Sequence, residues 1–230
     1  MRSPLQPQVL FHIGPVGVSE AVVLSWGIVA LLALGAWSLR ARLHLRPSRT
    51  QAAMELLVLA VDSQIRDTMR VRPDPYRGFI GTLFVYILLA NWCSLLPGLE
   101  PPTAQLETDI ALALLVFGAV FVFGLRAGGV RGMLAGFAVP NPLMIPLNVA
   151  ENITRTFSLF VRLFGNVMSG VFVVGIVLSL AGLLVPIPLM ALELLTGAVQ
   201  AYIFAVLAMV FIASSLSDDV SPTKPGGPSP

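Results

Sequence analysis

Hydrophobic positions fall into a few long blocks along the chain, and polar positions are confined to the segments between them. Five apolar runs reach or approach the roughly 20 residues that cross a bilayer as a helix. They lie at Val22 to Leu39, Phe79 to Leu96, Ile110 to Leu125, Phe157 to Val185 and Leu189 to Leu216. The pattern predicts an all-α membrane protein with about five hydrophobic helical segments.

Composition supports this prediction and excludes several classes of protein. The chain has 230 residues, of which 56% are hydrophobic and 11% charged, and its mean hydropathy of +0.86 is too high for a soluble domain. Its single cysteine, Cys93, lies inside an apolar run and supports neither a disulfide framework nor a thiolate metal site. The sequence has no GxxxxGK[ST], HExxH or CxxC motif, so we expect no catalytic residue, metal or cofactor.

Charged residues are sorted by segment. Eight arginines lie between the first two runs, and Arg126 and Arg131 follow the third run. The loop between the second and third runs carries only the acidic residues Glu100, Glu107 and Asp109. The positive-inside rule then places the N-terminus outside and the C-terminus in the cytoplasm. Because the distribution matters more than the net charge of +2, we expect no nucleic-acid partner.

These features divide the chain into six segments. We expect an outside N-terminal segment (1–20), a transmembrane helix (21–39) and a cytoplasmic basic segment with an amphipathic helix (40–78). A transmembrane hairpin with an acidic outside loop (79–139), a long tilted helical hairpin with the ion path (140–216) and a disordered cytoplasmic tail (217–230) are expected to follow.

The basic segment contains the expected amphipathic helix, TQAAMELLVLAVDSQIRDTM. Asp62 and Arg66, four residues apart, are predicted to pair on it. Its apolar face is predicted to contain Met54, Leu57, Val61 and Ile65. Two positions for this helix stay open: the cytoplasmic membrane interface, or the surface of a partner protein.

Prolines delimit the C-terminal hairpin. None occurs between Pro146 and Pro186, so a helix over Leu147 to Val185 would be about 58 Å long at about 1.5 Å per residue. That is about twice the hydrocarbon thickness of a bilayer, and the helix must tilt or kink. Pro186 and Pro188 then lead into the last helix. We therefore predict a hairpin of two long, strongly tilted helices.

An arginine lies inside the first helix of this hairpin. Arg162 occurs in SLFVRLFGN and is followed by 30 residues without a charged side chain. An arginine at the bilayer centre costs from about 2.5 to more than 10 kcal/mol, and it cannot practically lose its proton. Asn166, Ser158 and Ser169 share its helix face. Upstream, Glu151 and Arg155 are four residues apart and are expected to pair.

The last helix carries a matching polar stripe, because Glu193 and Gln200 are seven residues apart with Gly197 between them. A hairpin would bring this stripe near that of Arg162. One hypothesis is that the two stripes line aqueous access to an ion site in the membrane. The alternative is a structural salt bridge between Arg162 and Glu193.

Three stretches of the chain resemble one family. ENITRTFSLFVRLFGNVMSG, GTLFVYILLANWCSLLPGLEPPTA and VQAYIFAVLAMVFIA resemble, in order, the arginine signature, the second span with its outside loop, and the last helix of subunit a of F-type ATP synthases. The resemblance extends from about Val18 to Ser215. It implies a non-catalytic stator subunit in a rotary complex with a c-subunit ring, the b subunits of the peripheral stalk and the remaining subunits, in a bacterial inner membrane.

The resemblance also implies roles for individual residues. Arg162 would face the ring carboxylates between two half-channels for protons, supported by Asn166, with Glu193 and Gln200 along the outer route. Weaker candidates for half-channel lining are Asn148, Glu151, Ser158, Ser169, Glu107 and Asp109.

The sequence departs from the family pattern at three positions: Val171 where an acidic residue or histidine is frequent, Gln105 where the loop has aspartate, and Thr156 where proline is common. Because Val171 removes a titratable group, a sodium-coupled version of the same machine is an alternative. A self-contained ion channel or transporter, and a scaffold whose polar residues only hold helices together, are further alternatives.

Overall fold

The computed structural model describes residues 9–13, 16–41, 49–93, 101–138, 145–181 and 186–216. Within these ranges the chain forms a short β-hairpin, six α-helices and one 3₁₀ turn. They are β1 (Val9–Ile13), β2 (Val16–Ser19), α1 (Glu20–Ala41), α2 (Arg49–Met69), α3 (Asp74–Trp92), η2 (Pro102–Ala104), α4 (Leu106–Ala138), α5 (Ile145–Ala181) and α6 (Pro186–Leu216).

Four of the described helices, α1, α4, α5 and α6, are long and apolar enough to cross a membrane. The chain is therefore an all-helical integral membrane protein, as predicted. Helix α3 covers the remaining predicted run but begins earlier, with Asp74 and Arg77 in its first turn. Residues 94–96 of that run lie outside the described residues, and a fifth span stays a prediction.

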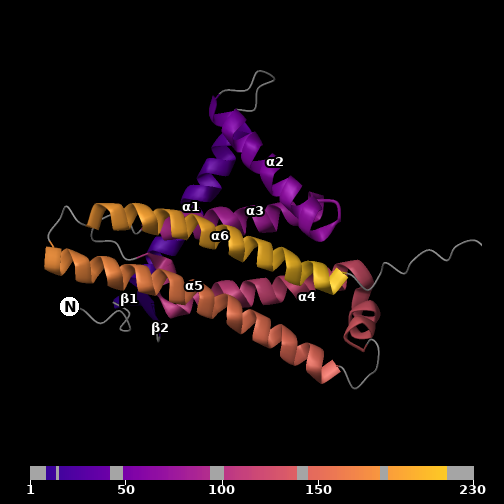
Figure 1. The fold of residues 1–230 in the computed structure, drawn as a ribbon. Helices are drawn as coiled ribbons and strands as arrows, with labels where there is room; N and C mark the ends of the chain where they lie inside the picture. Colours follow the sequence, from indigo (N-terminus) through magenta and orange to yellow (C-terminus); the bar gives the residue numbers. More distant parts are fainter. Residues whose placement is uncertain are drawn as a thin grey trace, which may run out of the picture.

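The core of the molecule is a bundle of α3, α4, α5 and α6 (Figure 1). Helix α6 packs against each of the other three and also against α2. Three alanines, Ala201, Ala205 and Ala208, lie on its buried face together with Phe204 and Ile212. Small side chains let neighbouring backbones approach closely, which is how helices associate where lipid supplies no hydrophobic driving force.

Helices α1 and α2 project from this bundle as two arms of a V (Figure 1). The apolar side chains of α1 are largely exposed; Leu31 and Leu34 are each 61% exposed and Trp37 is 72% exposed. Because a hydrocarbon environment accepts such side chains without penalty, this exposure fits a helix that faces lipid.

The corner between α2 and α3 corrects one prediction. Arg70 follows α2 with a φ of 56°, and this left-handed conformation turns the chain so that α3 packs against α2. As a result Asp62 accepts two hydrogen bonds of 2.5 Å from Arg77 on α3. The predicted Asp62–Arg66 pair is not among the ion pairs of the described residues. The bidentate geometry of Arg77 is stronger than a single exposed i,i+4 contact.

The predicted C-terminal hairpin is confirmed. Helix α5 has 37 residues and α6 has 31, both longer than the roughly 20 that a perpendicular crossing needs, and the two pack against each other. Helix α4 continues beyond the predicted Leu125 to Ala138, with a kink at Gly129, where φ is 64°. The N-terminal hairpin of β1 and β2 was not predicted. The predicted disordered tail, residues 217–230, lies outside the described residues.

Candidate functional site

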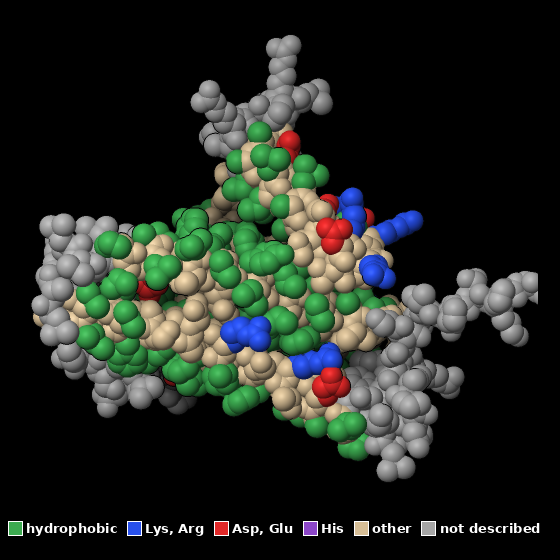
Figure 2. All heavy atoms as spheres, viewed as in Figure 1, with side chains coloured by type: hydrophobic (Ala, Val, Ile, Leu, Met, Phe, Trp, Pro, Cys, Tyr) green, Lys and Arg blue, Asp and Glu red, His purple; other side chains and the backbone are tan. Residues whose placement is uncertain are grey.

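Helix α5 packs an apolar face against the bundle, and Arg162 lies on the helix next to that buried face. Leu159 and Leu163 are 1% and 0% exposed, whereas the side chain of Arg162 is exposed. Figure 2 shows basic side chains among hydrophobic side chains on one face of the molecule, some of them beside acidic side chains. Among the described residues, no ion pair joins Arg162 to Glu193, so the structural salt bridge considered above is not formed within this chain.

Arg155, seven residues earlier on the same helix, has partners within the chain. It forms the predicted ion pair with Glu151, donates a hydrogen bond of 3.3 Å to Oγ of Ser214, and lies 5.5 Å from the ring centroid of Phe211. The two arginines of α5 therefore differ: one is tied to α6, and the other extends from the bundle without an ion-pair partner in the described part of the chain.

The other predicted residues of α5 lie along the same side as Arg162. Ser158 and Ser169 are exposed and Asn166 is half-buried. The hydroxyl of Ser169 donates to the backbone carbonyl of Asn166 over 2.9 Å. The side chain of Asn148 lies outside the described residues.

Glu193 on α6 faces α5 at Gly170. A Cβ atom placed on Gly170 would lie 2.8 Å from Oε1 of Glu193, which is closer than such atoms approach. The absence of a side chain at position 170 thus makes room for the carboxylate between the helices. Gly170 is eight residues beyond Arg162, about 12 Å along the helix. Sequence analysis did not identify Gly170, because its role depends on a neighbour 23 positions away.

The first half of α6 is hydrogen-bonded to α3. Nδ2 of Asn91 donates to the carbonyl of Gly197 over 3.0 Å, and Oδ1 of Asn91 accepts from Oγ1 of Thr103 over 2.7 Å. Trp92 donates to the carbonyl of Leu194 over 3.4 Å. These contacts were not predicted, although an asparagine inside an apolar run was a usable signal.

Two other predicted residues are buried in the bundle. Gln200 is 5% exposed and Asp109 is 0% exposed. Nε2 of Gln200 and both carboxylate oxygens of Asp109 have no hydrogen-bond partner in the described part of the chain. Asp109 was predicted as an acidic residue of an outside loop, and the structure instead places it inside the first turn of α4.

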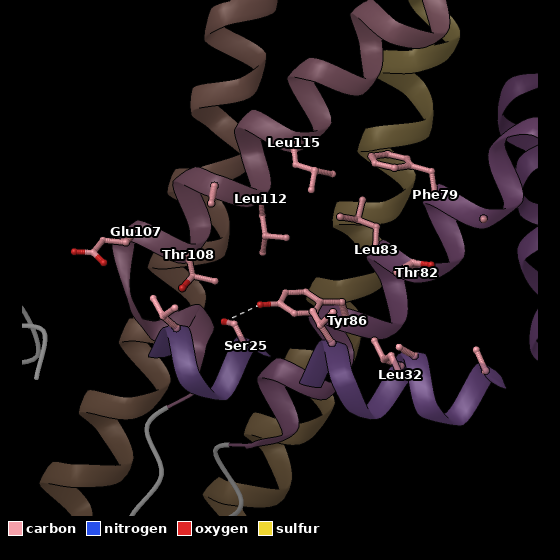
Figure 3. Close-up of a pocket in the computed structure, with 16 residues that line it drawn as sticks. Ser25, Leu32, Phe79, Thr82, Leu83, Tyr86, Glu107, Thr108, Leu112 and Leu115 are labelled. Carbon is pink, nitrogen blue, oxygen red and sulfur yellow. Dashed lines mark hydrogen bonds between the residues drawn. The ribbon is translucent and has the colours of Figure 1, made fainter. Parts of the chain in front are cut away.

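Glu107, two residues earlier, is exposed and borders a different feature. A cavity of about 870 Å³ separates α1 from α3 and α4. Its walls are mostly apolar and include Leu32, Leu83 and Leu112 (Figure 3). The hydroxyl of Tyr86 donates to Oγ of Ser25 over 3.0 Å and links α3 to α1 across it.

Comparison with known proteins identifies the family. A model of the family described as ATP synthase A chain matches residues 22–213. ATP synthase subunit a 2 of Bradyrhizobium sp. is 52% identical, covering 93% of this chain and 96% of that protein. ATP synthase subunit a of Albidiferax ferrireducens is 40% identical, covering 98% of this chain and 99% of that protein. ATP synthase subunit a 2 of Acaryochloris marina is 45% identical, over 90% and 89%. With the arginine helix and the bundle around it inside the matched residues, the chain belongs to the ATP synthase A chain family.

Proposed function

We propose that this chain is the stator subunit of a rotary F-type ATP synthase and provides two half-channels that carry protons to and from the carboxylates of the c-subunit ring. The observation that carries this proposal is Arg162, a permanent charge on an apolar surface whose ion-pair partner is absent from the described part of the chain. Such a charge in a membrane requires compensation, which a neighbouring subunit must then supply.

A carboxylate that passes Arg162 would lose its proton there, because an adjacent positive charge favours the ionised form. The same fixed charge repels a proton trying to cross directly between the half-channels. A proton must therefore ride on the ring from one half-channel to the other. Each charge that moves through 100 mV supplies about 2.3 kcal/mol, and rotation delivers this energy to the catalytic subunits. The chain itself performs no catalysis.

The polar residues around Arg162 are proposed to line the two routes. Glu193 with Gln200 would line the outer route, and Asn166 would support the arginine. Glu151 with Asn148 would lie near the inner mouth. Ser158, Ser169, Glu107 and Asp109 are the remaining proposed lining residues. The position of Glu193 against Gly170, where the helices leave space for a carboxylate, supports an ion-accessible gap between α5 and α6.

The proposed orientation places the N-terminus outside and the C-terminus in the cytoplasm of a bacterial inner membrane. The proposed partners are the c-ring, the b subunits of the peripheral stalk and the remaining subunits of the complex. The length of α5, 37 residues, supports a helix tilted along the curved ring, where it can contact several c subunits.

The test compares the two arginines of α5 in the complete complex reconstituted into liposomes. Arg162→Ala should abolish ATP-driven proton pumping while the complex still assembles, because the side chain is exposed. Arg155→Ala is the matched control, since it removes the same charge from the same helix, and it should retain most of the pumping. Pumping by Arg162→Ala at the wild-type level would refute the proposal.

Three further experiments distinguish the alternatives. Sodium uptake that persists in the presence of a protonophore, and still requires Arg162, would assign sodium rather than protons to the same mechanism. Ion movement by this subunit reconstituted without the ring would indicate a self-contained channel or transporter. Variants Arg162→Lys and Glu193→Gln that change stability but not coupled transport would indicate a scaffold.

A further inference from the structure

Two buried polar groups of complementary chemistry lack partners in the described part of the chain. Both carboxylate oxygens of Asp109 are hydrogen-bond acceptors when ionised, and Nε2 of Gln200 is a donor. The two residues are 0% and 5% exposed. Buried polar atoms are nearly always hydrogen-bonded, either to protein or to water, so each of these groups requires a partner that the described side chains do not supply.

The packing of α4 against α6 puts these groups at the same level of the bundle. The two helices run in the same direction (Figure 1), and a Cβ on Gly124 would lie 3.5 Å from Ser215. Fifteen residues before these two positions, about 22 Å along each helix, lie Asp109 and Gln200. Because both are buried, they face the interior of the bundle at this level.

A third and a fourth element meet there. Asn91 of α3 donates to Gly197, which is one turn from Gln200, and it also accepts from Thr103 of η2. Thr103 is 0% exposed, and the residues around it from Pro101 to Ala104 are all buried. Non-helical backbone at membrane depth occurs where it is enclosed by protein or lines a water-filled cavity. The turn η2 therefore closes the outer end of the bundle over a polar interior.

The cost of burying a charge determines whether the Asp109 carboxyl is protonated at rest. An ionised carboxylate without a partner in a low-dielectric interior is strongly unfavourable, so the isolated side chain keeps its proton. A water molecule can bridge groups of this kind where two or more polar partners surround it. Water between Asp109 and Gln200 would accept from the amide and exchange a proton with the carboxyl.

We infer that Asp109 is a proton-exchanging residue of the outer route, acting through water shared with Gln200. This inference rests on the proposed function and adds a role to it. In one cycle the O–H bond of the Asp109 carboxyl breaks as its proton passes to water on the inner side. A new O–H bond then forms with a proton from water on the outer side. The side chain is unchanged after each transfer, and one proton has moved.

The helices of the bundle carry other ionisable groups, whose titration must be separated from that of Asp109 in the experiment. Tyr86 lies on α3 and Cys93 at its C-terminal end, Glu193 on α6 and Arg162 on α5, while Glu107 precedes Asp109 on α4. Replacing Asp109 alone leaves all of these in place. A change in pH dependence that follows only the substitution at position 109 then belongs to Asp109.

The experiment uses the complete complex in liposomes and measures ATP-driven pumping between pH 6 and 9, together with assembly. Asp109→Asn keeps the shape and removes the titration, and it should lower pumping at least about tenfold, as the loss of an acid–base group does. Asp109→Glu should retain pumping with an altered pH profile. Glu20→Gln, which neutralises another acid at the outer end of the molecule, should leave pumping unchanged.

Wild-type pumping by Asp109→Asn across this pH range would overturn the inference. Asp109→Ser, which leaves room for a water molecule, guards against a packing defect. If Asp109→Asn, Asp109→Ser and Asp109→Glu all fail to assemble, Asp109 is required for folding and the inference fails. The Arg162→Ala complex runs in parallel: inactive Arg162→Ala with normal Asp109→Asn refutes only this inference, whereas normal Arg162→Ala refutes the proposed function.

Discussion

The polar side of α5 and the end of the bundle next to η2 handle polar groups in opposite ways. At the η2 end, Asn91 contacts both α6 and η2, and these hydrogen bonds stay inside the chain. On α5, Arg162 extends from an apolar surface with no ion-pair partner in the described part of the chain. The first arrangement holds helices together. The second leaves a charge exposed at the surface of the chain.

The same contrast appears within one helix. Arg155 uses Glu151, Ser214 and Phe211 as partners, and Arg162 has no such ion pair there. A count of charged residues in the membrane would treat these arginines alike. Their surroundings indicate that only Arg162 is available to an incoming carboxylate.

The largest effect should come from exchanging Arg162 with its buried neighbour. The double variant Arg162→Leu, Leu163→Arg keeps the composition but turns the charge into the bundle, where Leu163 is 0% exposed. A buried charge without a partner costs several kcal/mol, so the subunit should be absent from membranes. Immunoblots of membrane fractions test this, with Arg162→Leu alone as control. Normal levels of the double variant would mean that α5 can rotate and that the contrast does not hold.

A smaller but still large effect is expected at Gly170. Gly170→Leu places atoms where the Glu193 carboxylate lies, since even a Cβ would approach it to 2.8 Å. The carboxylate end of a flexible side chain can move, so the subunit should assemble while ATP-driven pumping drops severalfold. Gly165→Leu is the control, because a Cβ on Gly165 would meet no atom within 4 Å. Equal pumping by the two variants would contradict a defined position for Glu193.

The hydrogen bonds of Asn91 should contribute less. Asn91→Ala removes contacts to Gly197 and Thr103, and interhelical hydrogen bonds in membranes average about 0.6 kcal/mol each. A destabilisation of about 1 kcal/mol is expected, seen as earlier thermal dissociation of the subunit from the complex. Thr103→Ala, which removes one of the two bonds, should give about half of this. A loss of several kcal/mol in either variant would show that this end of the bundle does not tolerate missing hydrogen bonds.

The smallest effect is expected outside the four membrane-capable helices, at the corner of α2 and α3. The hydrogen bonds and charge of Arg77 hold the pKa of Asp62 below its ordinary value, against an opposing effect of burial. A lowered folded-state pKa means that Asp62 stabilises the corner above the unfolded pKa near 3.9, and that this contribution is lost as pH falls through the lower folded-state pKa. Hydrogen exchange of α2 amides should be faster in Asp62→Asn than in the wild type at pH 7. This difference should shrink in acid, and an unchanged difference would assign the effect to shape rather than charge.

Hydropathy and spacing were sufficient for much of the fold. Four membrane-capable helices and the long C-terminal hairpin follow from apolar runs and from prolines at the ends of these runs. The Glu151–Arg155 pair followed from spacing alone, because both partners lie on one helix. The Asp62–Arg66 pair was wrong for the same reason: spacing considers only partners on the same helix, and Arg77 approaches from the next one.

The residue types of the site could be predicted from the sequence, but the burial of each side chain could not. Asp109 and Glu107 look alike in the sequence, as acidic residues of one loop, yet Asp109 is buried and Glu107 is exposed. This difference arises from how η2 and α4 pack against later helices, which no local pattern records. Gly170 was missed for a related reason, since its importance appears only when Glu193 is placed beside it.

The burial of η2 also constrains how the protein is made. The turn packs against α1, α3 and α4, which precede or adjoin it, but also against α5, which is synthesised later. During insertion, Thr103 and its neighbours therefore stay uncovered until the C-terminal hairpin enters the membrane. Until that moment the nascent chain presents an uncovered turn that a protease or chaperone can reach. Maturation of the subunit should therefore be detectable as a loss of protease accessibility at this turn.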